Sequence, residues 1–362
     1  MRVLVVNAGS SSLKLSVLDD DELVASTLTE RWSGEDDAGP LQQLLDSTGP
    51  VDAVGHRVVH GGPRHLAAAR VDDGLLAELA ELTDLAPLHQ ARALGGLRAT
   101  ARLLLSVPAV ACFDTSFHRT LPPAARTYAL PARWNARWGL QRFGFHGLSH
   151  AHAARRAAEL VGRSLADLRV VTCHLGAGAS LCAVRDGRSV DTTMGFTPLA
   201  GLVMQTRPGD VDPGLLLWLL DHGLSTGELT DGLVHRSGLA GLSGTSGDLR
   251  DVLAAREDGD AAAGLAYDVL VHHLTGQVAA MAAACGGLDV LVLTGGMGEH
   301  APVLRADLAG RLAFLGCRLD GAANDGAACD RDISAAGAAV RTLVVTARED
   351  LEVAREVRQL LD

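Results

Sequence analysis

Two hairpins of similar design constrain the fold of this chain more than any other sequence feature. The first joins a short apolar strand, Val3–Val6, to a return strand, Leu13–Leu18, through a tip of small residues. The same order recurs at Arg169–Cys173 and Leu181–Val184, again around a small-residue tip. Such tips let backbone N–H groups approach an anion, because no bulky side chain blocks them. The repeat predicts two similar domains that each begin with a hairpin.

Residue identities at one constant offset support this internal duplication. They pair Val3 with Val170, Gly9 with Gly176, Val17 with Val184, and Asp19 with Asp186. Four identities are few, so two unrelated hairpins in one chain are the alternative. Strand-like and helix-like patterns alternate along the chain, which favours an α/β fold. We expect one domain over residues 1–147 and a second over 148–348, with a helix over 349–362 packing back on the first.

The composition is that of a folded globular protein. The chain has 362 residues, of which 48% are hydrophobic and 21% charged, which suffices for two packed domains. The formal net charge is −11, so its field repels nucleic acid and anionic membranes, and neither is an expected partner. No apolar run reaches the ~18 residues of a membrane span. The cysteines form no C-x-x-C motif, so we expect free thiols and a cytoplasmic protein.

Lysine occurs once, at Lys14, among 32 lysine and arginine residues. A lysine that survives such a bias is expected where a compact ammonium is needed and an arginine does not fit. A third glycine tip, Thr294–His300, follows another predicted strand. Each tip alone would be an ordinary turn, but three tips with a lysine beside the first favour phosphate binding.

Competing motifs are weaker. A Walker P-loop is absent, because the residue directly before Lys14 is Leu13 and not the glycine that the motif requires. The acyl-enzyme signature S-x-x-K occurs at Ser11–Lys14, but its companion K-T-G needs a second lysine that the chain lacks. Gly296–Ala301 fits the dinucleotide pattern G-x-G-x-x-A, which leaves an oxidoreductase as a minor alternative.

Histidines and arginines beside glycines are further candidates. The segment His146–His152 lacks the H-E-x-x-H glutamate of a zinc site, so one functional histidine is expected there. Arg57 precedes a glycine pair, and Arg207 lies in a predicted turn. Each could be a solvated surface arginine, whereas together they could clamp a transferring phosphoryl group from two sides.

Longer motifs resemble those of the acetokinase family, within the superfamily of actin, the sugar kinases and the heat-shock chaperone ATPases. They run in the family's order along the whole chain, at Asn7–Lys14, Gly55–Gly62, Ala86–His89, Phe113–His118, Arg142–His150, His174–Ser180, Met194–Pro213, Gly238–Asp251, Gly295–Glu299 and Glu349–Leu351. The resemblance implies an α/β fold of duplicated actin-like (ribonuclease H-like) ATPase domains with a central nucleotide cleft, and a homodimer.

The resemblance also implies a role for each matching residue. Asn7 and Glu349 would hold Mg²⁺, with Mn²⁺ as an alternative. The catalytic residues would be Asp114, Arg57, Arg207 and His146, and Asp114 would position rather than deprotonate, because acetate is already ionised at pH 7. The substrate would contact Arg57, Val59, Leu88, Phe145 and Pro198. ATP or ADP would bind at Ser10, Ser12, Lys14, His174, Leu175, Gly176, Ala177, Gly178, Asp248, Leu249, Arg250, Gly296, Met297, Gly298, Glu299 and His300.

The implied activity is that of an acetate kinase, which transfers a phosphoryl group reversibly between ATP and acetate to give acetyl phosphate and ADP. The alternatives are a kinase for propionate or another short-chain acid, and a low-turnover nucleotide-binding protein on the same scaffold. Several residues depart from the family pattern, most notably Ala177, where the family has asparagine. The others are Gln90, Ala200, Gln205, His300 and Arg348. Either compositional drift explains these departures, or they alter the affinity for nucleotide.

Overall fold

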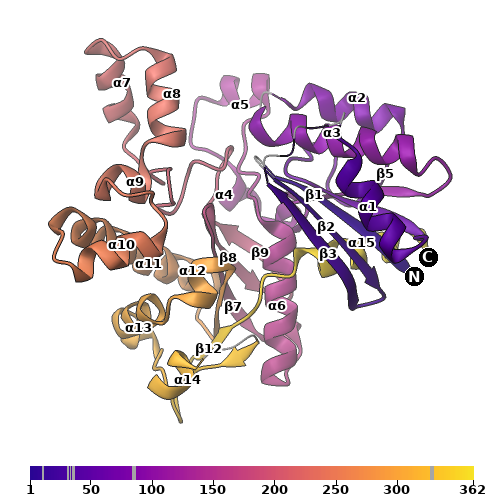
Figure 1. The fold of residues 1–362 in the computed structure, drawn as a ribbon. Helices are drawn as coiled ribbons and strands as arrows, with labels where there is room; N and C mark the ends of the chain where they lie inside the picture. The colour runs from indigo at the N-terminus through magenta and orange to yellow at the C-terminus, as the bar shows by residue number, and fades with distance from the viewer. Residues whose placement is uncertain (10–11, 31, 33, 35–36, 84–86, 327–329) are drawn as a thin grey trace. The chain divides into compact units, whose positions relative to one another are not determined.

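The computed structural model describes residues 1–9, 12–30, 32, 34, 37–83, 87–326 and 330–362, without the side chains of residues 87–89. The chain divides into two compact units (Figure 1). Unit 1 comprises Met1–Arg119, Phe145–His152 and Arg348–Asp362, and unit 2 comprises Thr120–Gly144 and Ala153–Ala347. The domain boundary expected after residue 147, and the cleft expected between the domains, stay predictions.

Unit 1 is built on a six-stranded mixed sheet in the order β3-β2-β1-β4-β6-β5. Strands β1 to β3 run antiparallel as a meander, while β4 and β6 run parallel to β1. The carboxyl ends of β1, β4 and β6 therefore meet at one edge of the sheet. The strands are β1 (Arg2–Ala8), β2 (Ser12–Asp19), β3 (Glu22–Glu30), β4 (Ala53–Val58), β5 (Ala69–Arg70) and β6 (Ala109–Phe113).

The C-terminal helix α15 (Glu349–Leu361) covers one face of this sheet. Val3 and Val5 share a buried cluster with Val353 of this helix, because alternate residues of a strand point to the same face. A Cβ at Gly55 of β4 would lie 2.5 Å from the Val353 side chain. Glycine at this position therefore lets α15 approach the sheet closely.

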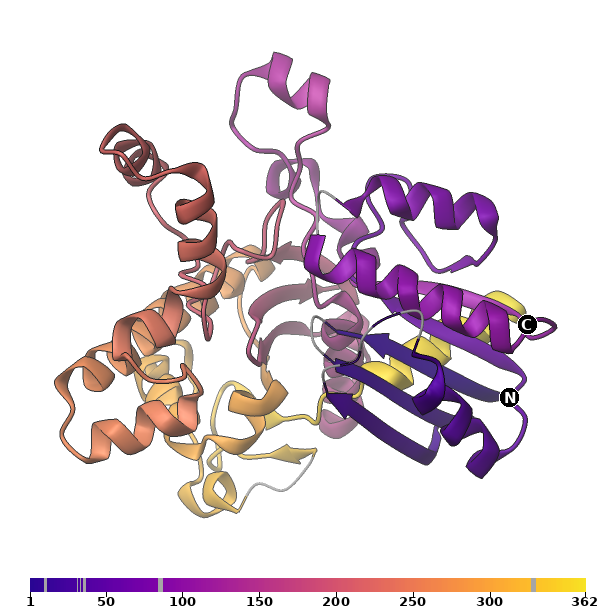
Figure 2. The same ribbon diagram turned by 45° about the horizontal axis from the view of Figure 1, so that its top comes forward.

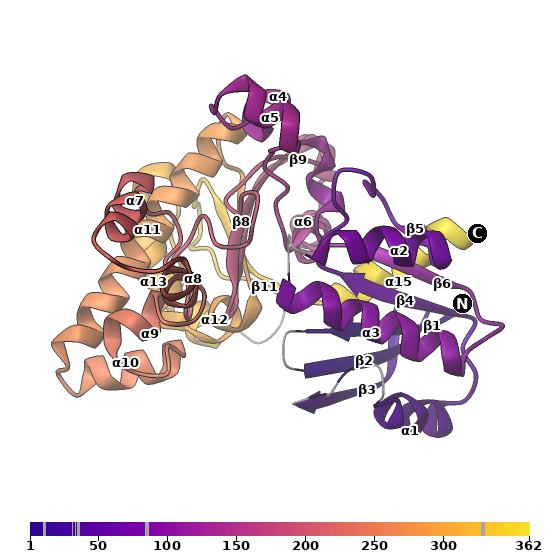
Figure 3. The same cartoon turned by 90° about the horizontal axis from the view of Figure 1, so that it is seen from above.

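The opposite face packs against helices from the first third of the chain. Leu4 and Val6 share a buried cluster with Leu41 and Leu44 of α1, and α3 crosses β1 and β4 on the same side. Figures 2 and 3 show α3 and the yellow α15 on either side of the sheet. The helices of this layer are α1 (Gly39–Thr48), α2 (Asp73–Glu81) and α3 (Pro87–Leu103).

Unit 2 contains a second six-stranded sheet, in the order β11-β12-β10-β7-β8-β9. Its strands are β7 (Arg169–Leu175), β8 (Ala179–Arg185), β9 (Arg188–Thr192), β10 (Val290–Thr294), β11 (Arg331–Asp332) and β12 (Arg341–Val344). The remaining helices are α4 (Pro123–Arg126), α5 (Ala132–Trp138), α6 (Gly147–Val161, which begins in unit 1), α7 (Pro213–Asp221), α8 (Thr226–His235), α9 (Gly238–Ser243), α10 (Leu249–Glu257), α11 (Ala261–Cys285), α12 (Gly295–His300), α13 (Pro302–Arg311) and α14 (Gly321–Asp325).

The two sheets have the same strand order and strand directions. The antiparallel meander β7-β8-β9 repeats β1-β2-β3, and β10 and β12 take the parallel positions of β4 and β6. Both sheets also begin alike, because the backbone N–H of Arg2 donates to Asp52 at 2.7 Å and that of Arg169 donates to Asp289 at 2.8 Å. The duplicated α/β fold is confirmed, and the alternative of two unrelated hairpins is wrong.

The constant sequence offset holds for the first strand of each hairpin and fails for the second. Val3 pairs with Leu18, and its counterpart Val170 pairs with Val184. Val184 therefore corresponds to Leu18 and not to Val17. The reason is that the second tip is one residue shorter than the first, which displaces the whole return strand by one residue.

The same displacement affects the turn after each return strand. Asp186 corresponds to Asp20 rather than to Asp19. Both of these aspartates have positive φ, 51° at Asp20 and 53° at Asp186. Aspartate tolerates this backbone conformation better than most residues, and tight hairpin turns require it.

No helix within the described ranges is long and apolar enough to cross a membrane. Five cysteines are free and buried in the structure, namely Cys112, Cys173, Cys182, Cys285 and Cys317, and Cys329 lies outside the described residues. Burial raises the pKa of the Cys173 and Cys182 thiols, which keeps them protonated at neutral pH. The cytoplasmic location stays a prediction.

Candidate active site

A network of polar side chains lies at the carboxyl ends of the parallel strands of unit 1. Asn7 and Arg57 are register partners on β1 and β4, and Asp114 follows β6. Arg57 donates from Nε and Nη2 to the two carboxylate oxygens of Asp114 at 3.1 and 2.7 Å. Its Nη1 donates to Asn7 Oδ1 at 3.3 Å and lies 3.1 Å from Oε2 of Glu349, the first residue of α15. The structure thus brings four predicted site residues into one network.

Burial and pairing together set the charges of this network. The Asp114 side chain is 1% exposed and that of Arg57 is 17% exposed. Burial lowers the pKa of Arg57, but attraction to Asp114 and Glu349 outweighs burial, so the pKa lies above its usual value. Burial raises the pKa of Asp114, while Arg57 acts against that rise. Because both oxygens of Asp114 accept N–H bonds from one guanidinium, we take it to be a carboxylate that holds Arg57 in place.

His146 is joined to Asp114 through the backbone. The N–H of Gly147 donates to the carbonyl oxygen of Asp114 at 2.8 Å. A Cβ at residue 147 would lie 2.2 Å from that oxygen, so only glycine fits there. His146 itself has a φ of 58°, a strained value for a residue other than glycine. The start of α6 therefore sets the position of His146 relative to the backbone of Asp114.

The predicted acyl pocket is described in part. Phe145 is buried, and its ring meets the ring of His60 edge-on with centroids 5.4 Å apart. Burial lowers the pKa of His60 to about 4, so this imidazole is neutral at pH 7. Val59 precedes His60 and is half-buried. The Leu88 side chain lies outside the described residues and Pro198 belongs to unit 2, so the pocket as a whole stays a prediction.

Lys14 lies on β2 directly across from Asn7 of β1. Cross-strand partners point to the same face of a sheet, so Lys14 stands on the same face as that asparagine. Its side chain is exposed, and no carboxylate in the described part of the chain forms an ion pair with it. Ser12 opens β2, and its carbonyl oxygen accepts the N–H of Gly9 at 2.8 Å. Ser10 lies outside the described residues.

The two residues predicted to hold a metal ion present oxygen donors side by side. Asn7 Nδ2 donates to Glu349 Oε2 across 3.5 Å, and Asn7 Oδ1 and that carboxylate contact the same nitrogen of Arg57. Mg²⁺ commonly binds through one or two carboxylates together with substrate phosphates. One carboxylate and one amide oxygen fit that requirement. No cluster of three or more His, Cys, Asp or Glu residues with metal-binding geometry occurs among the residues described.

In unit 2, Arg207 contacts a predicted substrate residue. Its Nη1 donates to the Pro198 carbonyl oxygen at 2.9 Å and lies 3.6 Å from the sulfur of Met204. Burial lowers the pKa of this half-buried guanidinium. It forms no ion pair with any carboxylate in the portion of the chain that the structure describes, so its charge is available to an anionic ligand.

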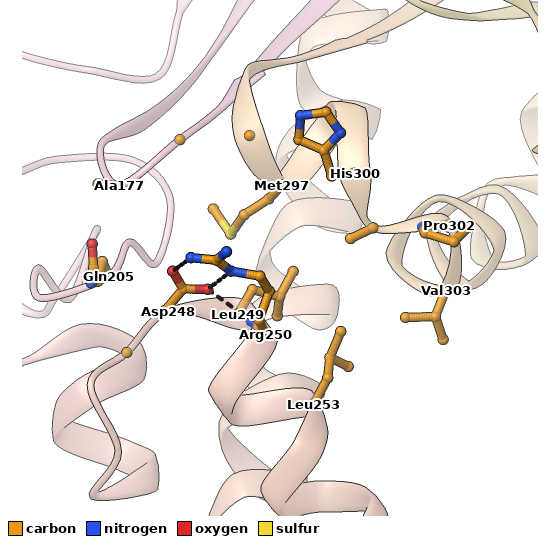
Figure 4. Close-up of a pocket in the computed structure, with 14 residues that line it drawn as sticks. Ala177, Gln205, Asp248, Leu249, Arg250, Leu253, Met297, His300, Pro302 and Val303 are labelled. Atoms are coloured by element: carbon orange, nitrogen blue, oxygen red, sulfur yellow. Dashed lines mark hydrogen bonds and ion pairs between the residues drawn. The ribbon is translucent and has the colours of Figure 1, made fainter. Parts of the chain in front are cut away.

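Unit 2 also contains a cavity of about 500 Å³ (Figure 4). This volume lies within the range of small-molecule sites. The tip between β7 and β8, the start of α10, and α12 with the start of α13 form its walls. Eight of the residues predicted to bind nucleotide line it, namely Gly176, Ala177, Asp248, Leu249, Arg250, Gly296, Met297 and His300. Their role in nucleotide binding stays a prediction.

Asp248 and Arg250 line this cavity and form an ion pair with each other (Figure 4). Asp248 accepts the backbone N–H of Arg250 at 2.9 Å, and the guanidinium folds back onto the same carboxylate at 2.7 and 3.0 Å. These hydrogen bonds lower the pKa of Asp248 to about 2. On another side of the cavity, the Ala177 carbonyl oxygen accepts the N–H of Gln205 at 3.2 Å, which ties the hairpin tip to the following loop.

Five other residues predicted for the nucleotide site do not line the cavity, namely His174, Leu175, Gly178, Gly298 and Glu299. Leu175 is buried in the core. Glu299 Oε1 accepts the backbone N–H groups of Gly295 and Ala347, each at 2.9 Å. This carboxylate therefore fixes Gly295, the first residue of α12, and other lining residues lie on the same helix.

The cavity also has lining residues that the sequence did not predict, namely Gln205, Gly247, Leu253, Ala301, Pro302 and Val303. Leu253 lies one helical turn after Leu249 on α10, so helical spacing could have placed it on the same face. The apolar residues at the start of α13 carry no such signal, because in a sequence they are indistinguishable from core residues.

Comparison with known proteins identifies the family. The sequence model of the acetokinase family matches residues 39–355. An acetate kinase of Synechococcus sp. is 43% identical over 401 residues, covering 100% of this chain and 99% of that protein. The crystal structure of Porphyromonas gingivalis acetate kinase has a TM-score of 0.92 at 34% identity and full coverage of both chains (100%). A propionate kinase from Francisella tularensis has a TM-score of 0.90 at 32% identity, covering 98% of each chain. The chain therefore belongs to the acetokinase family.

Proposed function

We propose that the chain catalyses reversible phosphoryl transfer between ATP and acetate, giving acetyl phosphate and ADP. The observation that carries this proposal is the network in unit 1, where Arg57 is held by Asp114 and Glu349 at the carboxyl ends of parallel strands. In α/β folds, ligands bind at this edge of the sheet. A guanidinium held there can meet a carboxylate or a phosphoryl group with two parallel hydrogen bonds.

Phosphoryl transfer requires positioning and charge neutralisation more than covalent chemistry. Asp114 would keep Arg57 oriented through two hydrogen bonds, and ionised acetate needs no base. Asn7 and Glu349 would hold Mg²⁺, which when bound neutralises charge on phosphate oxygens. His146 and Arg207 would donate hydrogen bonds to the transferring group, and the cavity of unit 2 would hold the nucleotide.

A direct assay tests this function. Purified protein is incubated with ATP, Mg²⁺ and acetate, and acetyl phosphate is trapped with hydroxylamine and measured as the hydroxamate. Turnover with acetate that requires both ATP and the metal ion supports the proposal. Absence of product in both reaction directions, with folded protein, overturns it in favour of a nucleotide-binding protein without turnover.

Propionate is the second candidate substrate, favoured by the similarity to a propionate kinase. One added methylene group changes discrimination by only ~1–3 kcal/mol in an apolar pocket. We expect propionate to react with a lower kcat/KM than acetate, and Val59→Ala to raise the relative use of propionate. A preference for propionate or butyrate in the unmutated protein would reverse the assignment of acetate as the main substrate.

Mg²⁺ is the proposed metal ion because the donors at the site are oxygens and the remaining ligands would be phosphates and water. Titration of the apo-protein with Mg²⁺ and Mn²⁺, followed by nucleotide binding and turnover, distinguishes the two ions. Glu349→Gln should weaken the metal dependence of turnover in both cases. Turnover that needs no divalent ion would contradict the assignment of Asn7 and Glu349.

We also propose a homodimer, with the hairpin of α7 and α8 as the surface that a second copy covers. None of the residues of α7 is buried, and Leu217 and Trp218 are 64% and 53% exposed. The hairpin carries Asp221 and Glu228, whereas α5 exposes Arg133 and Arg137 in a segment without acidic residues. A second copy can therefore offer opposite charge and apolar surface at once.

Light scattering after size exclusion tests the homodimer. The unmutated chain should have the mass of a dimer, and Leu217→Ser with Trp218→Ser should shift it to a monomer. Leu105→Ser is the matched control, because Leu105 is 88% exposed but lies in unit 1. A monomeric unmutated chain, or an unchanged dimer in the double variant, would contradict the proposed surface.

A further inference from the structure

The segment of residues 192–198 begins at the last residue of β9 and connects the sheet of unit 2 to Arg207. We call this segment the 192–198 loop. Its last residue, Pro198, accepts a hydrogen bond from Nη1 of Arg207 through its carbonyl oxygen at 2.9 Å. No carboxylate holds Arg207 in the described chain, and besides the weak contact with the Met204 sulfur this hydrogen bond to the loop positions its guanidinium.

Arg142 holds the first part of the 192–198 loop. Its Nη1 donates to three successive carbonyl oxygens, those of Thr192, Thr193 and Met194, at 3.0, 3.0 and 3.1 Å. Three consecutive carbonyls that converge on one nitrogen fix the direction in which the chain leaves β9. A charged donor makes such hydrogen bonds about twice as strong as a neutral donor does.

Tyr128 holds the middle of the loop. Its hydroxyl oxygen accepts the backbone N–H of Phe196 at 2.7 Å, and its ring centre lies 5.9 Å from the guanidinium carbon of Arg142. Gly195 lies beneath this hydroxyl, and a Cβ there would be 2.4 Å from the oxygen. The Gly195 carbonyl oxygen in turn accepts the N–H of Phe143 at 3.1 Å. The Tyr128 hydroxyl therefore both binds the loop backbone and occupies the space that any side chain at residue 195 would need.

We propose that Tyr128 and Arg142 are positioning residues for phosphoryl transfer, which act by holding the 192–198 loop and through it Arg207. Neither side chain reaches the cavity of unit 2 or contacts Arg207 itself in the described chain. The inference rests on the proposed function of Arg207 and adds two residues that nothing in the sequence pattern had assigned. It predicts that substitution of either residue lowers kcat/KM for acetate and leaves the KM for ATP nearly unchanged.

Kinetics of Arg142→Met and Tyr128→Phe test the inference. Displacement of a catalytic group by about 1 Å can reduce rate by up to 10²-fold. We expect kcat/KM for acetate to fall about 10-fold to 10²-fold in Arg142→Met and less in Tyr128→Phe. The KM for ATP should change less than about twofold, because other segments line the nucleotide cavity. Arg142→Lys should restore part of the loss, since one nitrogen makes all three bonds and an ammonium has three donors.

A second pair of variants tests the contact itself and does not depend on activity. Gly195→Ala should lower the melting temperature, because the new methyl group meets the tyrosine hydroxyl. Addition of Tyr128→Phe should recover part of this loss, since that substitution removes the atom that clashes. Gly310→Ala is the control, because a Cβ at Gly310 meets nothing within 4 Å. Absence of any recovery in the double variant would overturn the proposed contact.

The outcomes separate this inference from the proposed function. Failure of the unmutated protein to make acetyl phosphate overturns the proposed function. An active unmutated protein whose Arg142→Met variant keeps its kcat and its KM for acetate overturns the positioning role alone. A fall in kcat without any change in either KM, matched by a smaller folded fraction in Arg142→Met, also overturns it in favour of a structural role.

Discussion

In unit 1, Asn7 of β1, which belongs to the polar network of the candidate site, pairs across the hairpin with Lys14. The corresponding cross-strand pair in unit 2 is His174 and Ser180. The neighbouring parallel strand contributes Arg57 in unit 1 and Thr294 in unit 2. The same framework therefore presents an amide, an ammonium and a guanidinium in one unit, and neutral hydroxyls with an imidazole in the other. Equal backbone positions have acquired unequal charge.

The opposite edges of the two sheets have stayed alike. In both units an arginine at the start of the first strand donates its N–H to an aspartate that precedes the next parallel strand, as Arg2 does to Asp52 and Arg169 to Asp289. The side chains therefore differ between the units at the carboxyl ends of the parallel strands, where the candidate site residues of unit 1 lie. They are alike at the amino ends. This contrast supplies a matched control in unit 2 for a variant in unit 1.

The largest effect is expected at the charged network. Arg57→Ala removes the guanidinium that Asp114 and Glu349 hold, and it should lower kcat by about 10²–10³-fold, as loss of one preorganised donor does. Steady-state kinetics with acetate and ATP measure this. Arg169→Ala, which removes an arginine that pairs with Asp289 at 2.7 Å, should leave kcat within about twofold. Equal losses in the two variants would show that the ends of the two sheets do not differ in role.

A smaller effect concerns stability at acid pH. His56 of β4 is buried and occupies the position that Leu293 has in β10. Burial lowers its pKa to about 3, so below pH 6.5 the unfolded chain binds a proton that the folded chain does not. Stability therefore falls as the pH drops from about 6.5 toward 3. The loss from this group is about 2 kcal/mol between pH 7 and pH 5.

Thermal melts between pH 7.5 and 5.0 check this linkage. His56→Leu, which copies the residue of unit 2, should flatten the fall of the melting temperature toward acid pH. His272→Leu is the control, because His272 is exposed on α11. An unchanged pH dependence in His56→Leu would mean that another buried group is responsible.

Lys14 has no counterpart in unit 2, where Ser180 takes its position, and its exposure to chemical modification can be measured. An amine-selective reagent can modify only Lys14 and the N-terminus of this chain. If Lys14 neutralises phosphate oxygens, Mg-ATP should slow its modification severalfold, and modification should reduce activity. Peptide mass spectrometry with and without Mg-ATP gives the ratio. The N-terminal amine, which pairs with Asp20 at 2.8 Å, should label at the same rate in both cases and serves as the internal control.

The smallest effect is expected at the second hairpin tip. Ala177 lines the cavity of unit 2 and offers no side-chain donor. Ala177→Asn should lower the KM for ATP severalfold, because a hydrogen bond to a charged acceptor contributes ~1.5–3 kcal/mol when well placed. The KM for acetate should barely change. A weaker affinity for ATP would show that this tip has been rebuilt around alanine.

Much of the fold could be predicted because it depends on local patterns. Short apolar strands, small-residue tips and acidic turns follow from neighbouring residues, and they indicated both hairpins. The displacement of the second return strand could not be predicted, because a tip that is one residue shorter leaves the pattern of apolar residues intact. Only the pairing of Val170 with Val184 reveals it.

The sequence could predict which residues belong to the candidate site, but not which of them contact one another. Asn7, Arg57, Asp114 and Glu349 came from the family resemblance, and nothing in their spacing says that one guanidinium joins all of them. Arg142 opens one of the family-like motifs, but neither it nor Tyr128 was given a role, because their partners are backbone groups, which carry no sequence signal. Glu299 was predicted at the nucleotide, whereas the structure engages its carboxylate with two backbone N–H groups.

The sequence by itself determined that this chain is a duplicated α/β protein, because strand and helix periodicity and glycine tips are properties of neighbouring residues. It also determined the family, because long motifs recur in order along the whole chain. Only the tertiary structure decided which residues meet, since parallel strands bring together positions that lie far apart in the chain. Burial then decided their chemistry, because removal of Asp114 and Arg57 from water makes each depend on the other for its charge.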